Sequence, residues 1–209
     1  MEPTPIQREI IQEVGNTVVL AMPGSGKTFV LSEKIRRILE SDVLKDYQGV
    51  IAISYTRKAS GHLKRKTLQN GICEKNSFFG TIDSFCLTQI ILPFGYYVMG
   101  YPKGEVVPIT ENDLNSNRKV DFEWINKIHP DYEEINESVW ENLYELFKDG
   151  KVLVSSLELM ALHIIKNCPA CRAHLKARFK YVFIDEFQDA DTYTNGIFLE
   201  LIGLGLIGN

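Results

Sequence analysis

One short segment, residues 21–28, constrains the fold of this chain more than any other. It reads Ala-Met-Pro-Gly-Ser-Gly-Lys-Thr, and it lies between a β-branched apolar run at 17–21 and a stretch at 27–40 whose apolar residues recur at a helical spacing. A strand that enters a glycine-rich turn and leaves it as a helix is the setting of a P-loop. Glycine lets backbone N–H groups converge on phosphate oxygens, and the helix start favours anions. The alternative interpretation is an ordinary glycine-rich turn between a strand and a helix.

The polar side chains of two segments have defined uses in nucleotide chemistry. In a P-loop, Lys27 can reach the terminal phosphates and the Thr28 hydroxyl can bind Mg²⁺. Asp185 and Glu186 follow a buried strand predicted at 181–184, and ligands of parallel sheets bind at the carboxyl ends of strands. We therefore expect Asp185 to hold Mg²⁺ and Glu186 to deprotonate the attacking water. A small-molecule kinase would not need that second carboxylate, so hydrolysis is favoured, although an isolated Asp-Glu pair is often a solvated loop.

Segments typical of strands and of helices alternate in the first 92 residues and again near the end. The expected strands lie at 17–21, 50–54 and 181–184, and the expected helices at 6–14, 27–40, 57–70, 84–92 and 193–203. Pro93 should end the helix at 84–92. This alternation predicts an α/β P-loop NTPase fold with a parallel sheet covered on both faces.

The middle of the chain differs from its two ends. Residues 93–104 hold two prolines, three glycines and three tyrosines, which predicts a loop. Residues 110–178 carry apolar residues at a helical spacing that Pro130 interrupts, so at least two helices are expected there. Trp124 and Trp140 should lie in the core of this segment. We interpret it as a mainly helical insertion in the α/β domain.

Charge is unevenly distributed, and this bears on the kind of partner. The formal net charge is −4, but residues 111–149 alone carry −7 and residues 54–75 carry +5. Such asymmetry says more about partners than the total charge does. A basic segment can follow nucleic-acid phosphates, although most charge runs are solvated helix faces.

Composition excludes several classes of protein. The chain is 44% hydrophobic and 24% charged, which is typical of a globular protein. No secretory signal is visible, and no apolar run approaches the roughly 18 residues of a membrane span. Four cysteines are too few for a disulfide scaffold. We therefore expect a cytoplasmic protein with reduced cysteines and no membrane partner.

Four potential metal ligands lie close together in the sequence. His163, Cys168, Cys171 and His174 fall within 12 residues, which raises the possibility of a zinc site. However, no second distant pair of ligands accompanies them, and the segment has a helical pattern. We therefore favour apolar packing of the cysteines over metal binding.

The two nucleotide motifs together resemble those of the UvrD/Rep-type superfamily 1 DNA helicases. Residues 21–28 are similar to motif I of that family, in which alanine at the first position is normal, and Asp-Glu-Phe-Gln-Asp at 185–189 is similar to motif II. Gln7 lies 20 residues before Lys27, at the place of the family's Q motif. Glutamine can pair bidentately with adenine, so the resemblance implies ATP as the nucleotide.

Further motifs follow in the family's order. Tyr-Thr-Arg-Lys-Ala at 55–59 resembles motif Ia, and Gly-Thr-Ile-Asp-Ser-Phe at 80–85 resembles motif Ib. Both face single-stranded DNA in the family. The resemblance implies that residues 1–92 with 176–209 form a RecA-like core, subdomain 1A, and that residues 93–175 form subdomain 1B.

The resemblance assigns roles to individual residues. Those that would bind nucleotide are Gln7, Pro23, Gly24, Ser25, Gly26, Lys27 and Thr28. Thr28 and Asp185 would hold Mg²⁺, Lys27 and Glu186 would act in catalysis, and Gln188 would sense the nucleotide. Those that would contact single-stranded DNA are Thr56, Arg57, Lys58, Thr81 and Ser84.

The chain departs from the family pattern at several positions. Met22 replaces the usual glycine, Phe29 stands where a basic residue often occurs, and Arg57 stands where asparagine is usual. Asp83 stands where histidine is common, and a carboxylate is unfavourable beside DNA phosphates.

Motif III and the second RecA-like domain of the family would lie beyond Asn209. We therefore expect the ATP-binding and hydrolysing half of a DNA helicase or single-strand translocase, which would not unwind DNA alone. The alternative is a non-motor ATP-binding module that regulates or docks a partner.

Overall fold

The structure is a computed structural model, and it describes residues 2–20, 22, 24–114, 122 and 130–209. The chain divides into two compact units. The first unit consists of residues 1–82, 173–189 and 201–209. The second consists of residues 83–172 and 190–200. The predicted subdomain boundaries, 1–92 with 176–209 and 93–175, stay a prediction.

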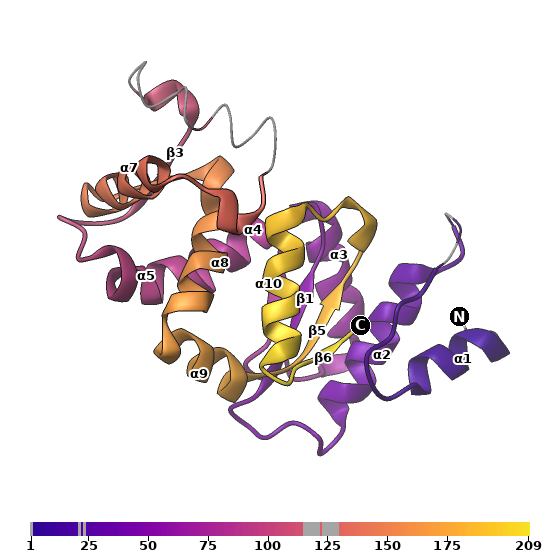
Figure 1. Cartoon of the computed structure of the whole chain (residues 1–209). Helices are drawn as coiled ribbons and strands as arrows, with labels where there is room; N and C mark the ends of the chain where they lie inside the picture. The colour runs from indigo at the N-terminus through magenta and orange to yellow at the C-terminus, as the bar shows by residue number, and fades with distance from the viewer. Residues whose placement is uncertain (1, 21, 23, 115–121, 123–129) are drawn as a thin grey trace. The chain divides into compact units, whose positions relative to one another are not determined.

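The first unit contains a four-stranded parallel sheet in the order β2-β1-β5-β6, of which β1, β5 and β6 are labelled in Figure 1. Its strands are β1 (Gly49–Ile53), β2 (Phe78–Gly80), β5 (Phe179–Ile184) and β6 (Ile207–Gly208). All five residues of β1 are buried, which explains why its sequence is a continuous apolar run and not an alternating one. Ile53 lies opposite both Gly80 and Ile184, so that β2, β1 and β5 end together at one edge.

Two helices pack on one face of this sheet. They are α2 (Lys27–Glu40) and α3 (Arg57–Thr67), and a third helix, α1 (Pro5–Gln12), precedes them. The shared core is built from α2, α3, β1 and β5, with these buried residues: Ile35, Leu39, Leu44, Val50, Ala52, Leu63, Tyr181 and Phe183. Each fully buried aliphatic or aromatic side chain contributes about 1.5–3 kcal/mol. This core therefore fixes α2 and α3 relative to the sheet.

The strand expected at 17–21 is not formed by its described residues, so that prediction was wrong for 17–20. Val18 and Leu20 are 80% and 93% exposed. The run meets the sheet at its start, where the Thr17 N–H donates to the Gly208 carbonyl at 3.0 Å. Strand propensity acts through cross-strand packing. Since β6 is two residues long, the run has too little neighbouring strand to pair with.

A continuous helical stretch corrects two further predictions, the end of a helix at Pro93 and the first part, 93–99, of the loop expected over 93–104; residues 100–104 form no helix or strand, as predicted. It comprises α4 (Ile82–Phe85), the π-helical segment η2 (Cys86–Ile91) and α5 (Leu92–Met99). The Leu92 N–H donates to the carbonyl of Leu87, five residues earlier. Pro93 thus falls in the first turn of a new α-helical segment, where its missing N–H breaks no bond.

By length and composition alone, the helix Ile82–Met99 could cross a membrane, with a mean hydropathy of 1.2. The expectation that no stretch would meet this criterion was therefore wrong, although core helices of globular proteins also meet it. Ile90 and Ile91 are fully buried, and η2 contacts α8 (Leu157–Asn167). A Cβ at Gly95 would lie 2.7 Å from the Phe147 ring. The buried apolar side chains of this helix therefore pack inside the second unit.

The remaining elements of the insertion are mostly helical, as predicted. Within residues 93–175 they are α7 (Glu137–Lys148), α8 and most of α9 (Pro169–Arg178), with short 3₁₀ turns at Glu111–Asp113, Tyr132–Glu134 and Val154–Ser156. Outside the insertion lie α10 (Thr192–Gly203) and the 3₁₀ turns at Gln69–Gly71 and Phe187–Asp189. A two-stranded parallel sheet of β3 (Val107–Ile109) and β4 (Lys151–Leu153) was not predicted. Trp140 is half-buried in the second unit, and Trp124 lies outside the described residues.

Candidate nucleotide and nucleic-acid site

The predicted motifs of the first unit converge because three parallel strands end at the same edge. The motif Ia segment follows β1, Thr81 follows β2, and Asp185 follows β5. The Asp185 N–H donates to the Ile53 carbonyl at 2.9 Å, which holds the start of motif II against the end of β1. This edge is where parallel α/β sheets bind their ligands.

The glycine-rich turn has the backbone conformation that its residues predict. Gly24 and Gly26 have φ values of +79° and +88°, in the left-handed region that favours glycine, and α2 begins directly afterwards at Lys27. A Cβ at Gly26 would lie 3.0 Å from Nε2 of Gln7. The turn therefore keeps backbone N–H groups at a helix start, which suits a phosphate. Pro23, also assigned to this site, lies outside the described residues.

Gln7 links α1 to the glycine-rich turn. Its Nε2 donates to the Ser25 carbonyl at 3.1 Å, and its Oε1 accepts from the Thr4 N–H at 2.9 Å. The second bond belongs to a capping box in which Thr4 caps α1 and Pro5 starts it. The structure thus gives Gln7 a positioning role beside the phosphate loop. Its role in reading adenine stays a prediction.

Lys27 and Glu186 join the two nucleotide motifs directly. Lys27 Nζ lies 3.3 Å from Glu186 Oε2, and both side chains are partly buried. Gln188 Nε2 donates to the same carboxylate oxygen at 2.5 Å. The hydrogen bonds from Gln188 and then Lys27 lower the pKa of Glu186. Two donors therefore hold this carboxylate in its charged form.

The backbone at Glu186 is strained. Its φ is +62°, a left-handed conformation that costs a non-glycine residue about 1–3 kcal/mol. The Asp189 N–H donates to the Glu186 carbonyl at 3.1 Å and helps to hold this conformation. Strain of this kind concentrates at functional sites. It turns the carboxylate of Glu186 toward α2 at the end of the buried strand.

Asp185 and Thr28 fit the predicted Mg²⁺ site. Asp185 is half-buried, and burial, followed by the charge of Glu186, raises the pKa of its carboxyl. Such an environment favours a bound cation. Thr28 is half-buried in the first turn of α2, next to the Lys27 that contacts Glu186. Mg²⁺ typically takes one or two protein ligands and completes its shell with phosphates and water. This donor set is adequate for that chemistry.

The predicted DNA-binding residues of the first unit lie at the start of α3 and after β2. Thr56, Arg57 and Lys58 are exposed, and the Thr56 hydroxyl caps α3 by accepting from the Ala59 N–H at 3.1 Å. The helix start and the two cations give this point of the edge a positive potential. Thr81 is half-buried.

Another basic residue of α3, Lys64, makes contacts inside the first unit. Lys64 pairs with Glu74 at 2.7 Å and lies over the Phe79 ring at 5.9 Å. Lys64 therefore contacts neighbouring side chains of the first unit, whereas Arg65 is exposed.

The second unit contains Asp83 and Ser84 of motif Ib. Asp83 is hydrogen bonded to Glu158 of α8. Burial, followed by this hydrogen bond, raises the pKa of Glu158 to about 8. The carboxyl pair explains how an aspartate is accommodated at this position. The Ser84 carbonyl accepts from the Thr88 hydroxyl at 2.6 Å.

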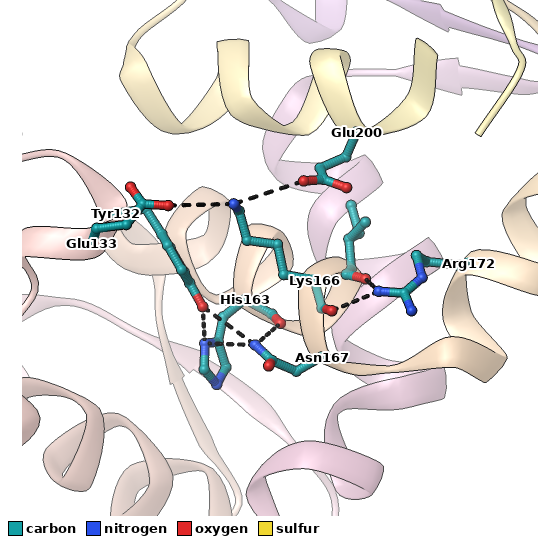
Figure 2. A network of polar contacts seen from close by, with 8 residues as sticks. Tyr132, Glu133, His163, Lys166, Asn167, Arg172 and Glu200 are labelled. Carbon is teal, nitrogen blue, oxygen red and sulfur yellow. Dashed lines mark hydrogen bonds and ion pairs between the residues drawn. The ribbon is translucent and has the colours of Figure 1, made fainter. Parts of the chain in front are cut away.

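The four possible zinc ligands have other contacts in the structure. The ring nitrogens of His163 lie 2.6 Å from the hydroxyls of Tyr132 and Tyr144, and its ring stacks on Trp140 at 4.1 Å (Figure 2 shows His163 with Tyr132). Burial lowers the pKa of His163 to about 4. Among the described residues, no group of three or more histidine, cysteine or acidic side chains is arranged to hold a metal. Cys168 and Cys171 are buried, in agreement with apolar packing.

Comparison with known proteins identifies the family. The model of the UvrD/REP helicase N-terminal domain matches residues 4–94 and 101–205. The chain belongs to this helicase family. Its relatives include the Gabija protein GajB of Bacillus cereus, 26% identical over 93% of this chain and 36% of that protein. DNA helicase II of Haemophilus influenzae is 23% identical, and that of Escherichia coli 24%, each over 88% of this chain and 30% of the relative. The helicase-family chain thus spans about a third of the length of these curated relatives.

Two contacts of this helicase-family site were not predicted from the sequence. They are the Lys27–Glu186 ion pair and the bond from Gln7 to the Ser25 carbonyl. The position of both motifs at the carboxyl ends of strands predicted that they would be near each other, but not which side chains would touch. The departure at Asp83 was a signal of a changed contact, because a carboxylate there needs a partner.

Proposed function

We propose that this chain is the ATP-binding and hydrolysing part of an ATP-dependent DNA helicase or single-strand DNA translocase. The observation that carries the proposal is the contact between Lys27 and Glu186 at the sheet edge where β2, β1 and β5 end together. A phosphate-binding lysine and a water-activating carboxylate are thereby within reach of one nucleotide. Membership of the helicase family supports the same function.

Each residue of the site would have a distinct task in ATP hydrolysis. The N–H groups around Gly24 and Gly26 would bind the phosphates, and Lys27 would exchange Glu186 for the terminal phosphates. Thr28 and Asp185 would hold Mg²⁺, which when bound supplies positive charge that neutralises the phosphates. Glu186, released from Lys27, would accept a proton from the attacking water. Gln188, already bonded to Glu186, would respond to the state of the nucleotide.

Single-stranded DNA would lie along the same edge of the sheet. Arg57 and Lys58 would contact its phosphates, and Thr56, Thr81 and Ser84 would contribute polar contacts. The relatives are about three times longer than the matched region, so we propose that arginines of a second RecA-like domain complete catalysis. The isolated chain would then bind Mg-ATP weakly, turn it over slowly and not unwind DNA.

The nucleotide part of the proposal is tested by titrating a fluorescent ATP analogue with Mg²⁺ present. Lys27→Ala should weaken binding roughly tenfold to a hundredfold, because a charge-assisted hydrogen bond contributes about 1.5–3 kcal/mol. Glu186→Gln should keep binding and abolish residual hydrolysis. Glu33→Gln, which breaks an ion pair with Arg36 on α2, is the matched control and should change neither. Equal affinity of Lys27→Ala and wild type would contradict the proposal.

The DNA part is tested by measuring binding of a single-stranded oligonucleotide across a range of salt concentrations. Replacing Arg57 and Lys58 by alanine should lower the slope of log affinity against log salt by about 1.4, since each phosphate contact contributes about 0.7. Lys64→Ala is the control, because Lys64 is paired with Glu74. Nucleotide binding without any DNA binding would instead support a non-motor ATP-binding module.

A further inference from the structure

The corner between α8 and α9 brings two cysteines together. Cys168 follows the last residue of α8, and its N–H donates to the Ile164 carbonyl at 2.8 Å. Pro169 then starts α9, so Cys171 lies in the first turn of that helix. The Cys171 N–H donates to Sγ of Cys168 at 3.4 Å. The sulfur of Cys168 therefore caps the helix that contains Cys171.

Arg172 clamps this corner. One of its guanidinium nitrogens, Nη1, donates to the carbonyls of Ile165 at 3.2 Å and Lys166 at 2.6 Å, at the end of α8 (Figure 2). The Asn167 side chain donates to the His163 carbonyl at 2.9 Å and so closes the same turn. The two helix ends are thus held by side chains on both sides of the cysteines. The separation of the two thiols is set by the fold.

That separation suits a disulfide bond. Two residues three apart in a helical turn have Cα atoms about 5 Å apart, which lies within the roughly 4.4–6.8 Å that a disulfide needs. The contact from the Cys171 N–H to the Cys168 sulfur shows that the Cys168 side chain is directed over the first turn of α9. At this Cα separation, rotation of the two side chains can bring the sulfur atoms together.

We propose that Cys168 and Cys171 are a redox-active dithiol that closes to an intramolecular disulfide in the folded protein. The oxidant is a small disulfide of the glutathione class. The Cys168 thiolate attacks one sulfur of that disulfide, its S–S bond breaks, and one thiolate leaves. Cys171 then loses its proton to solvent and attacks the Cys168 sulfur, which releases the second thiol. Two protein thiols are oxidised and one small disulfide is reduced to two thiols.

The environments of the two thiols distinguish their roles. Cys171 is fully buried, and burial, followed by the nearby Cys168, raises its pKa to about 12. It therefore suits the resolving step, in which its proton leaves only after Cys168 has reacted. Cys168 is 2% exposed and directly precedes α9. This burial predicts slow exchange and a disulfide that is protected from reductants.

The test uses the whole chain and does not depend on nucleotide or DNA binding. Wild-type protein is equilibrated with mixtures of reduced and oxidised glutathione, quenched with acid, alkylated in denaturant and digested with trypsin. The tryptic peptide 167–172 contains Cys168 and Cys171 and no other cysteine, so mass spectrometry reports this pair alone. The same titration in urea gives the equilibrium constant for disulfide formation in the unfolded chain.

The equilibrium constant for disulfide formation should be at least tenfold larger in the folded chain than in the unfolded chain. A tenfold ratio corresponds to a difference in reduction potential of about 30 mV for a two-electron couple. Cys171→Ser should accumulate a glutathione adduct on Cys168, whereas Cys168→Ser should leave Cys171 a free thiol. Arg172→Lys keeps the charge and the cleavage site but loosens the clamp, and should reduce the preference. Equal constants in the folded and unfolded chains would overturn the proposal, as would preferential modification of Cys171.

Discussion

A half-buried histidine of the second unit, His163, should make the stability of the protein dependent on pH. Both ring nitrogens of His163 are hydrogen bonded to tyrosine hydroxyls, from Tyr132 and Tyr144, and its ring stacks on Trp140. Neutral imidazole has one donor and one acceptor, so one hydroxyl accepts from the ring and the other donates to it. A protonated ring has two donors and no acceptor, and it would have to be charged where burial excludes water.

The magnitude follows from the shift in pKa. Burial lowers the pKa of His163 from 6.5 to about 4. Between these values the unfolded chain binds a proton that the folded chain does not, so the free energy of unfolding falls as the pH falls. One pKa unit corresponds to about 1.4 kcal/mol, and solvent screening of this partly exposed ring lowers the total, which gives a loss of about 1–3 kcal/mol over the whole interval. Above the unfolded pKa, the contribution is fully present.

The assay is urea unfolding followed by circular dichroism, at several pH values from about 7.5 to about 4. His163→Gln keeps a donor and an acceptor but has no proton to bind. Its free energy of unfolding should therefore lose about 1–3 kcal/mol less than that of wild type over this range. His62→Gln, at an exposed position on α3, is the matched control and should follow wild type. Parallel curves for wild type and His163→Gln would refute the reasoning.

Two further predictions concern a glycine and a glutamate. Gly26→Ala should lower the free energy of unfolding by about 1–2 kcal/mol, because Gly26 has a φ of +88° and the new Cβ would meet the Gln7 amide at 3.0 Å; urea unfolding measures this, and an unchanged value would contradict it. Glu158→Gln should make the protein more stable than wild type at about pH 9 and change it little at about pH 5. The reason is that Glu158, whose pKa is raised to about 8, is protonated in the folded protein, so that the free energy of unfolding of wild type falls as the pH rises through this value. Thermal unfolding at both pH values tests this.

The fold of the first unit could largely be predicted because its signals are local. The helix predicted over 27–40 is α2, with the same first and last residues, and the strands expected at 50–54 and 181–184 correspond to β1 and β5. These strands are buried on both faces, so an unbroken apolar run marks them without ambiguity about register. The chemistry of Lys27 is similarly local, because few folds place a lysine after a glycine-rich turn.

The errors arose where structure depends on distant partners. The run at 17–21 has strand composition, yet residues 17–20 form no strand beside the two residues of β6. Pro93 usually ends a helix, but the π-helical segment before it shifts the hydrogen-bond register by one residue. β3 and β4 have three residues each, which is too few for an alternation of apolar and polar residues to be recognised. A short stretch of sequence does not reveal which strand it will pair with or where the hydrogen-bond register of a helix changes.

The ion pair between Lys27 and Glu186 connects these structural details to catalysis. A carboxylate that accepts from both Lys27 and Gln188 is a poor base, because the same donors lower its pKa. The phosphates of a nucleotide would compete with Glu186 for Lys27, and their arrival would remove one of the two donors. Glu186 would thus become more basic at the moment when a water molecule beside the terminal phosphate needs activation. In the proposed mechanism, the arrangement that weakens Glu186 without nucleotide makes its activation conditional on nucleotide binding.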